Sequence, residues 1–189
     1  TEQPPHVIRF DATMNDLFLR PDGQEWLTTR RVSLPIAGQL IQRWDVDRAA
    51  IAGRALFLPS GDTVLGYSRD GEFVLVKRDH RLRRWNLATG QEDRPAFAET
   101  IGQLGDVWRF DNAMYAESRD GEYLTLWDLW KRERVGRIPV PTGSVKPSPD
   151  GRYLLVTEAL AKVVWDTGRG EAVGRAIPSQ CDVQACEFS

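Results

Sequence analysis

The chain has 189 residues, of which 41% are hydrophobic and 28% charged, so it can bury a core as one domain or two small ones. Its 25 basic and 27 acidic side chains leave a formal net charge of −2, which gives no overall attraction for nucleic acid or an anionic membrane surface. The sequence has no apolar run long enough for a membrane-spanning helix and no signal-peptide pattern, so we expect a cytoplasmic protein.

Four tryptophans recur along the chain at almost even spacing. The gaps between them are 41, 42 and 38 residues, and an Asp or Asn follows each one. The four are Trp44, Trp85, Trp127 and Trp165. A period near 40 residues, with a strand that ends in Trp-Asp, is typical of the blades of a β-propeller. The sequence therefore predicts an all-β fold of about four four-stranded antiparallel blades, with these tryptophans in the blade cores.

The first predicted blade spans residues 15–58. A turn at Asp22-Gly23 separates its first two strands, because glycine tolerates the positive φ that tight hairpin turns need. The next hairpin is extended: 22 residues separate Asp22 from Trp44, whereas the matching distance is 15 in the second and fourth units. The added residues fall around Arg31 to Gly38, where we expect an inserted loop of the kind that often carries function.

Three further blades are predicted at residues 59–100, 101–140 and 141–180. The second and fourth repeat the turn, at Asp70-Gly71 and Asp150-Gly151, and the third carries Asp111-Asn112 at this position. Residues 181–189 match the first strand of another blade. Because propellers close with about four to eight blades, we expect an incomplete ring, a segment of a larger one, in preference to a closed ring of four.

These motifs resemble those of WD40-repeat proteins over nearly the whole chain. The similar motifs are the turns at Pro21-Asp22-Gly23 and Pro149-Asp150-Gly151 and the Trp-Asp strand ends. They are most similar to the WD40 arrays of large bacterial multidomain proteins, where an array often follows a signalling domain such as a kinase or an ATPase. The resemblance implies a propeller that binds other proteins, or other domains of its own chain, and that needs no cofactor.

The polar network typical of WD40 blades is incomplete in this chain. In the family, a Gly-His pair, an Asp in the turn before the Trp strand and a Ser or Thr on the strand between bond together with the Trp. This sequence has no Gly-His pair. Asp79 in the second unit and Ser118 and Asp120 in the third keep part of the network, and Thr157 keeps the hydroxyl in the fourth. The departures imply blades that depend more on apolar stacking than on this network.

Candidates for partner contact follow from the same family geometry. Residues before the Trp strand lie on one face of a WD40 ring, which places Arg78, His80 and Arg119 there with the inserted loop. Trp130 stands in a basic turn and can contact a partner, and the alternative is that it covers the edge of its own blade. The basic run at 77–84 alternates along a strand, so we interpret it as a solvated hairpin and not as a nucleic-acid site.

Catalytic and metal-binding motifs are missing from the sequence. The Gly66-Tyr67-Ser68 segment lacks the second glycine of a nucleophile elbow, and the Asp-Gly turns lack the terminal Glu of a calcium loop. The histidines and cysteines offer no zinc spacing, and two cysteines make no disulfide framework. These four residues are His6, His80, Cys181 and Cys186. We expect neither a metal nor a cofactor.

We therefore expect a protein-interaction scaffold or regulatory module without catalysis of its own. The alternative is a propeller enzyme of hydrolase type with a site in the central channel, which needs acids or histidines that converge from several blades. The scarcity of histidine disfavours the enzyme. A third interpretation is structural, in which the repeat array governs the assembly of its parent protein.

Overall fold

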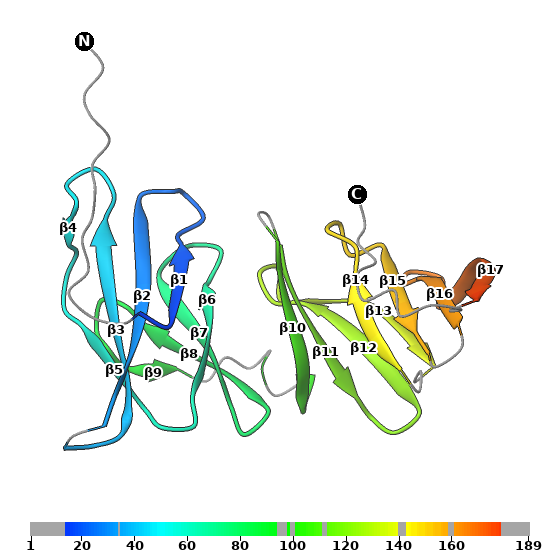
Figure 1. Cartoon of the computed structure of the whole chain (residues 1–189), viewed down its shortest axis with the longest axis horizontal. Helices are drawn as coiled ribbons and strands as arrows, with labels where there is room; N and C mark the ends of the chain where they lie inside the picture. Colours follow the sequence, from blue (N-terminus) through cyan, green and yellow to red (C-terminus); the bar gives the residue numbers. More distant parts are fainter. Residues whose placement is uncertain are drawn as a thin grey trace, which may run out of the picture. The chain divides into compact units, whose positions relative to one another are not determined.

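The computed structural model describes residues 14–33, 35–93, 98, 101–110, 113–139, 143–158 and 161–178 (Figure 1). The chain divides into two compact units, Thr1–Thr100 and Ile101–Ser189, and each contains two antiparallel sheets. Four features predicted from the sequence lie outside the described residues: Leu34 of the inserted loop, the Asp111-Asn112 turn, the strand at 181–189, and the two cysteines within it.

The first unit contains the first and second sheets. The first sheet runs β1 (Asp16–Leu19), β2 (Glu25–Val32), β3 (Gly38–Asp45) and then two short strands, β4 (Ala50–Ile51) and β5 (Leu56–Pro59), which both pair with β3. The second sheet runs β6 (Thr63–Tyr67), β7 (Phe73–Arg78), β8 (Arg81–Asn86) and β9 (Glu92–Asp93). Apart from β5, strands that are neighbours in sequence pair side by side, so each sheet is a meander.

The second unit repeats this architecture. The third sheet runs β10 (Leu104–Phe110), β11 (Ala113–Arg119), β12 (Tyr123–Asp128) and β13 (Glu133–Pro139). The fourth sheet runs β14 (Ser144–Pro147), β15 (Tyr153–Thr157), β16 (Ala161–Asp166) and β17 (Glu171–Pro178). The prediction of four antiparallel four-stranded units is confirmed, with the outer position of the first sheet divided between β4 and β5.

The Asp-Gly turns between first and second strands share one hydrogen-bond scheme. Asp70 Oδ1 accepts the amide of Glu72 at 3.0 Å, and Asp150 Oδ1 accepts the amide of Arg152 at 3.0 Å. The intervening glycines have φ values near 70°, a region that glycine enters without steric cost. In the fourth sheet Ser148 adds a hydroxyl that donates to Asp150 Oδ1 at 2.6 Å. The turn residues thus satisfy their own polar groups and fix where each hairpin reverses.

The residue after each tryptophan closes the next turn. Asn86 Oδ1 accepts the amides of Ala88 and Thr89, both at 2.9 Å, and Asp128 Oδ1 accepts two amides in the same way. Asp45 and Asp166 make equivalent bonds in their own sheets. A short acceptor side chain is needed because the turn leaves amide groups without a strand partner. This requirement explains the Asp of the recurring Trp-Asp pair.

The same turn puts its last residue into the left-handed backbone region. The residue four positions after the Asp or Asn has a positive φ in all four sheets. These residues are Ala49, Gly90, Arg132 and Gly170, with φ values of 48°, 71°, 62° and 68°. Alanine and arginine occupy this region at a cost that glycine does not incur. The turn therefore holds local strain in the first and third sheets.

Hydrogen bonding of the tryptophans differs between sheets. Trp44 Nε1 donates to Thr28 Oγ1 at 3.0 Å, and Trp127 Nε1 donates to Ser118 Oγ at 2.8 Å. The equivalent position in the second sheet is Val76, and among the described residues the buried indole N–H of Trp85 has no hydrogen-bond partner. The polar contact expected of Asp79 therefore does not reach this tryptophan.

The expected role of Thr157 in the fourth sheet is wrong. Trp165 pairs directly with Leu154, so the residue on its face two positions along β15 is Val156. Thr157 pairs with Lys162 and lies on the opposite face, because successive residues of a strand alternate between faces. The hydroxyl next to the tryptophan is thus present in the first and third sheets and replaced by valine in the second and fourth.

Apolar side chains form one core between the two sheets of each unit. In the first unit the core contains Leu27 and Ile41 of the first sheet, which are 0% and 1% exposed, with Val74 and Val76 of the second. In the second unit the third sheet contributes residues such as Leu126 and the fourth sheet residues that include Leu154, Val156 and Trp165. Full burial of one such aliphatic side chain contributes about 1.5–3 kcal/mol, so sheet-on-sheet packing is the main stabilising interaction.

The left-handed turn position predicts opposite effects for two substitutions in the first unit. Ala49→Gly should raise the free energy of unfolding by about 0.5–1 kcal/mol, because it removes the steric cost of φ 48°. Gly90→Ala, at the matching position of the second sheet, should lower it by about 1 kcal/mol, because a side chain is strained at φ 71°. The new Cβ adds no clash, since it meets only Leu56 Cδ1 at 3.7 Å. Urea unfolding of the three proteins tests this, and a destabilised Ala49→Gly protein would contradict it.

The Ser148 hydroxyl and the Arg152 amide hold the pKa of Asp150 below its usual value. A carboxyl with a lowered folded-state pKa adds stability above its unfolded-state pKa and loses it as the pH falls through the folded-state value. Ser148→Ala should raise the pKa of Asp150 towards the ordinary value, as measured by NMR titration of its carboxyl carbon. Asp120, whose pKa is lowered by the Tyr123 amide and Arg137, is the internal control and should titrate unchanged.

Candidate functional site

A groove of about 550 Å³ opens on the first unit, at the end of β2 that carries the inserted loop. Three segments surround it: the hairpin from β2 to β3, the turn from β5 to β6, and the start of β1. Its lining residues are Asp16, Arg31, Val32, Ser33, Ala37, Gly38, Gln39, Ser60, Gly61, Asp62, Thr63 and Val64. The structure thus places a concave surface where the lengthened hairpin predicted functional residues.

Close packing of β3 on β5 shapes one wall of the groove. Gly38 pairs with Pro59, and a Cβ at Gly38 would overlap the Leu58 carbonyl oxygen and the Phe57 ring. The amide of Ser60 donates to the Ala37 carbonyl at 3.2 Å and ties the two loops together. Gly38 is therefore required by this close approach, which holds the inserted loop beside the turn that follows β5.

Asp62, one residue of the groove lining, forms a buried ion pair. Asp62, whose side chain is 0% exposed, receives two hydrogen bonds from the guanidinium of Arg78 at the end of β7. The bonds to Asp62 raise the pKa of Arg78. A bidentate guanidinium–carboxylate pair has fixed geometry, so it joins the turn before β6 rigidly to β7. Arg78, which was predicted to contact a partner, thus has a structural contact with Asp62 of the groove lining.

Gln39 leaves an unused acceptor beside this pair. Its Nε2 donates to the Asp62 carbonyl oxygen at 3.2 Å. Its Oε1 is buried and, among the described residues, has no hydrogen-bond partner. A buried acceptor without a partner is costly, and a ligand that donates an N–H to it would remove that cost.

Sequence reasoning missed Asp62 and Gln39 as groove residues. Asp62 lies 16 residues from Arg78, and only the pairing of Thr63 with Lys77 across β6 and β7 brings the two together. No local motif marks that register. The one available signal was the lengthened hairpin that contains Gln39.

The other predicted contact residues lie outside the groove. His80 is exposed in the turn between β7 and β8, where its φ is 58°. Arg119 belongs to the second unit and pairs with the buried Glu117 at 3.3 Å. Trp130 is half-buried in the turn after β12, and its amide donates to Asp128 Oδ1. Within the first unit, Arg78 therefore reaches the groove lining through Asp62, and His80 is not part of that lining.

The basic run of β7 and β8 is largely paired with acids. Arg83 contacts Glu92 at 2.6 Å, and Arg84 contacts Asp93 and lies over the Phe73 ring at 4.1 Å. With Arg78 bound to Asp62, the described arginines of this hairpin each have an acidic partner except Arg81. Such pairing neutralises much of the positive charge that this run shows in the sequence.

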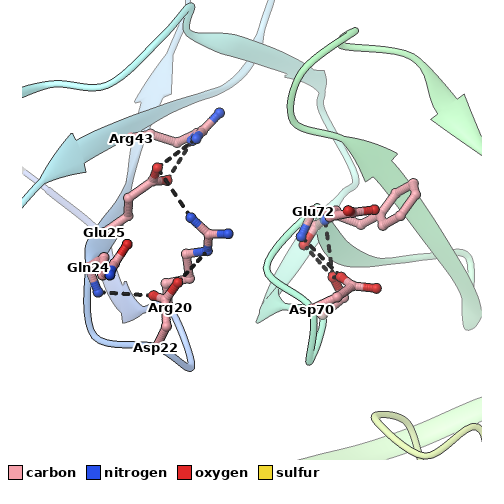
Figure 2. Close-up of polar contacts among 9 residues, drawn as sticks. Arg20, Asp22, Gln24, Glu25, Arg43, Asp70 and Glu72 are labelled. Atoms are coloured by element: carbon pink, nitrogen blue, oxygen red, sulfur yellow. Dashed lines mark hydrogen bonds and ion pairs between the residues drawn. The ribbon is translucent and has the colours of Figure 1, made fainter.

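A second charged cluster lies at the other end of β2 (Figure 2). Arg43 binds Glu25 through two bonds of 2.8 Å, and Arg20 reaches both Glu25 and Asp22 at 3.4 Å. Arg43 also donates to the Leu87 carbonyl of the second sheet at 3.5 Å. Hydrogen bonding to Glu25 raises the pKa of Arg43. Because these charges neutralise one another and span both sheets, we assign the cluster a structural role.

The described residues contain no group of three or more His, Cys, Asp or Glu side chains arranged to hold a metal ion. Within the same part of the chain, no helix has the length and apolar character needed to cross a membrane.

Known proteins resemble this chain in fold only. No family model matches it, and neither does any curated protein. A functionally unknown protein from Desulfotomaculum acetoxidans aligns over 91% of this chain and 59% of its own, with a TM-score of 0.52 and 17% identity. TolB from Acinetobacter baumannii aligns over 87% of this chain and 43% of its own, with a TM-score of 0.51 and 15% identity. Hydrazine synthase from Kuenenia stuttgartiensis aligns over 86% of this chain and 49% of its own, with a TM-score of 0.49 and 16% identity.

TolB is a β-propeller-like protein, so the likeness confirms the predicted all-β, propeller-type fold. The chain spans about half the length of the solved structures that it matches. Identities this low establish the fold and leave the finer WD40 assignment as a prediction.

The buried ion pair predicts unequal effects for two arginine substitutions in the first unit. Arg78→Ala should lower the free energy of unfolding by about 2–3 kcal/mol, because it leaves the fully buried Asp62 carboxylate without its charge partner. Arg48→Ala removes an ion pair of 3.8 Å whose arginine is 82% exposed, and should change stability by less than about 0.5 kcal/mol. Urea unfolding measures both, and equal effects would show that the Asp62 pair does not brace the groove.

Proposed function

We propose that this chain is a protein-interaction module of WD40-like repeats, without catalysis of its own, and that the groove beside the inserted loop docks a segment of a partner protein or of another domain. The observation that carries the proposal is the coincidence of the only lengthened second-to-third-strand hairpin among the described sheets with this groove. Regular repeats supply a rigid frame, and an irregular loop on such a frame is where binding residues concentrate.

The chemistry of the lining supports a polypeptide ligand. Neutral polar residues such as Ser33, Ser60 and Thr63 line the groove together with Gln39, whose Oε1 is buried and has no hydrogen-bond partner among the described residues. Ile36, on the inserted loop, is 64% exposed and offers an apolar contact. A polypeptide segment brings both backbone N–H donors and apolar side chains, which is the combination that these groups recognise.

The same lining gives little support to hydrolysis. General acid–base catalysis needs a group that exchanges protons with substrate, most often histidine or a carboxylate. The residues that line the groove include no histidine. Of the two carboxylates in the lining, Asp62 is held by Arg78, and Asp16 accepts a hydrogen bond from the Thr29 hydroxyl at 3.1 Å. We therefore prefer binding to catalysis.

A groove-filling substitution tests the proposal. Peptides selected from a random library on the immobilised chain should bind the wild type and lose about tenfold or more in affinity on Ser60→Trp, a loss of at least about 1.4 kcal/mol. Asp47→Trp is the matched control, since Asp47 is also an exposed turn residue but lies at the opposite end of β3. Calorimetry measures the affinities. A library that yields no binder, or binders indifferent to Ser60→Trp, would contradict the proposal.

A further inference from the structure

Arg31 is the one cationic residue in the described lining of the groove. It follows Leu27 and Thr29 at alternate positions of β2, so the three side chains share one side of the first sheet. Leu27 belongs to the core that the first and second sheets form together, which identifies this as the side that faces the second sheet. Arg31 is exposed near the end of the strand, where that side leaves the core and borders the groove.

The described ion pairs of the first unit leave the guanidinium of Arg31 without an acidic partner. Both acidic residues of the lining have other contacts: Asp62 binds Arg78, and Asp16 accepts a hydrogen bond from the Thr29 hydroxyl at 3.1 Å. Asp16 pairs with Thr29, so it lies one row farther from the inserted loop than Arg31 does. The loop end of the groove therefore presents a positive charge that a ligand can neutralise.

Hydroxyl groups accompany this charge at the loop end. Ser33 follows Arg31 by two positions, and Ser60 stands in the turn after β5, where its amide ties that turn to the inserted loop. Both serines are exposed and line the groove. A carboxylate accepts hydrogen bonds from a guanidinium and from hydroxyls together, so this set of donors suits an acidic group.

Gln39 adds an acceptor next to the charge. It pairs directly with Arg31 across β2 and β3, which places the two side chains on the same side of the sheet with their Cβ atoms about 5 Å apart. Its Oε1 is buried and has no hydrogen-bond partner among the described residues. A ligand that binds both residues must therefore bring an acidic group and an N–H donor close together.

We propose that the segment docked in the groove carries an aspartate or glutamate whose carboxylate binds Arg31, while a backbone N–H beside it donates to Gln39 Oε1. The inference rests on the proposed function, since it specifies what the groove recognises in the docked segment. An acidic residue in a polypeptide holds its carboxylate only a few bonds from its own N–H, so one residue can satisfy both contacts. A basic side chain can also donate to Gln39, but it would then meet the like charge of Arg31, which costs free energy.

Two adjacent arginines of β2 provide a matched test. Arg30 and Arg31 are both exposed and point to opposite sides of the first sheet, and only Arg31 lines the groove. Peptides that are selected on the wild-type chain and lose affinity on Ser60→Trp should be richer in Asp and Glu than the starting library. Calorimetry should show that Arg31→Glu weakens them about tenfold or more, because it replaces an ion pair by a repulsion. Arg30→Glu changes the net charge equally and should weaken them by less than about twofold.

Exchange of the charges separates direct contact from a loss of folding. Each acidic residue of a selected peptide is replaced in turn by lysine, and one such peptide should bind Arg31→Glu more tightly than the parent peptide does. The wild-type chain should show the opposite order. Arg31→Gln, which removes the charge without reversing it, should lose the preference for the acidic peptide and gain none for the lysine peptide. A reversed preference requires a folded groove, so it cannot arise from unfolding.

Two results would overturn the inference, and they differ in what they mean for the docking site. Groove-bound peptides that respond equally to Arg31→Glu and Arg30→Glu, or that are enriched in basic residues, would refute the acidic contact and leave the groove as a docking site. A library that yields no binder sensitive to Ser60→Trp would refute the docking site and the acidic contact together.

Discussion

Each sheet of this chain has one side covered with aliphatic side chains, and packing that side on a neighbouring sheet is the interaction that positions everything else. A single twisted meander of four short strands exposes too much apolar surface to be stable alone, so it needs a second layer. Leu27 and Val74 belong to one core in the first unit, and Leu126 and Leu154 belong to one core in the second. Val74 and Leu154 hold corresponding places, because each pairs directly with the tryptophan of its sheet. The spacing of about 40 residues is the length of chain that supplies one such layer.

The turns at the ends of the packed sheets contain backbone amides that have no strand partner. Short Asp and Asn side chains in the same turns accept hydrogen bonds from these amides. Asp70 and Asp150 serve one end, while Asn86 and Asp128 serve the turns after the tryptophans. Each of these acceptors therefore serves amides within its own turn. The inserted loop of the first sheet is longer than these turns, and the groove lies beside it.

The sequence predicted most of the fold and part of the groove. The tryptophan period and the Asp-Gly turns predict strands and hairpins because both depend on residues close together in the chain. Thr157 was misplaced because a shift of one residue in register moves a side chain to the other face, and local sequence does not determine register. The pair of Asp62 with Arg78 was missed for a related reason, since it depends on how β6 pairs with β7.

The surface of the first unit has a repeated part, the faces of its sheets, and an unrepeated part, the loops beside the groove. The faces of the sheets repeat, and within each unit one sheet packs on another of the same pattern. The hairpin around Ile36 and the turn at Ser60 do not repeat in the other described sheets, so under the proposed function they are the segments that would give specificity for a partner. Arg78 links the repeated and unrepeated parts, because it extends from strand β7 and binds Asp62 in the turn beside the groove. A partner docked in the groove would therefore contact a site whose shape is set by the packing of the first and second sheets.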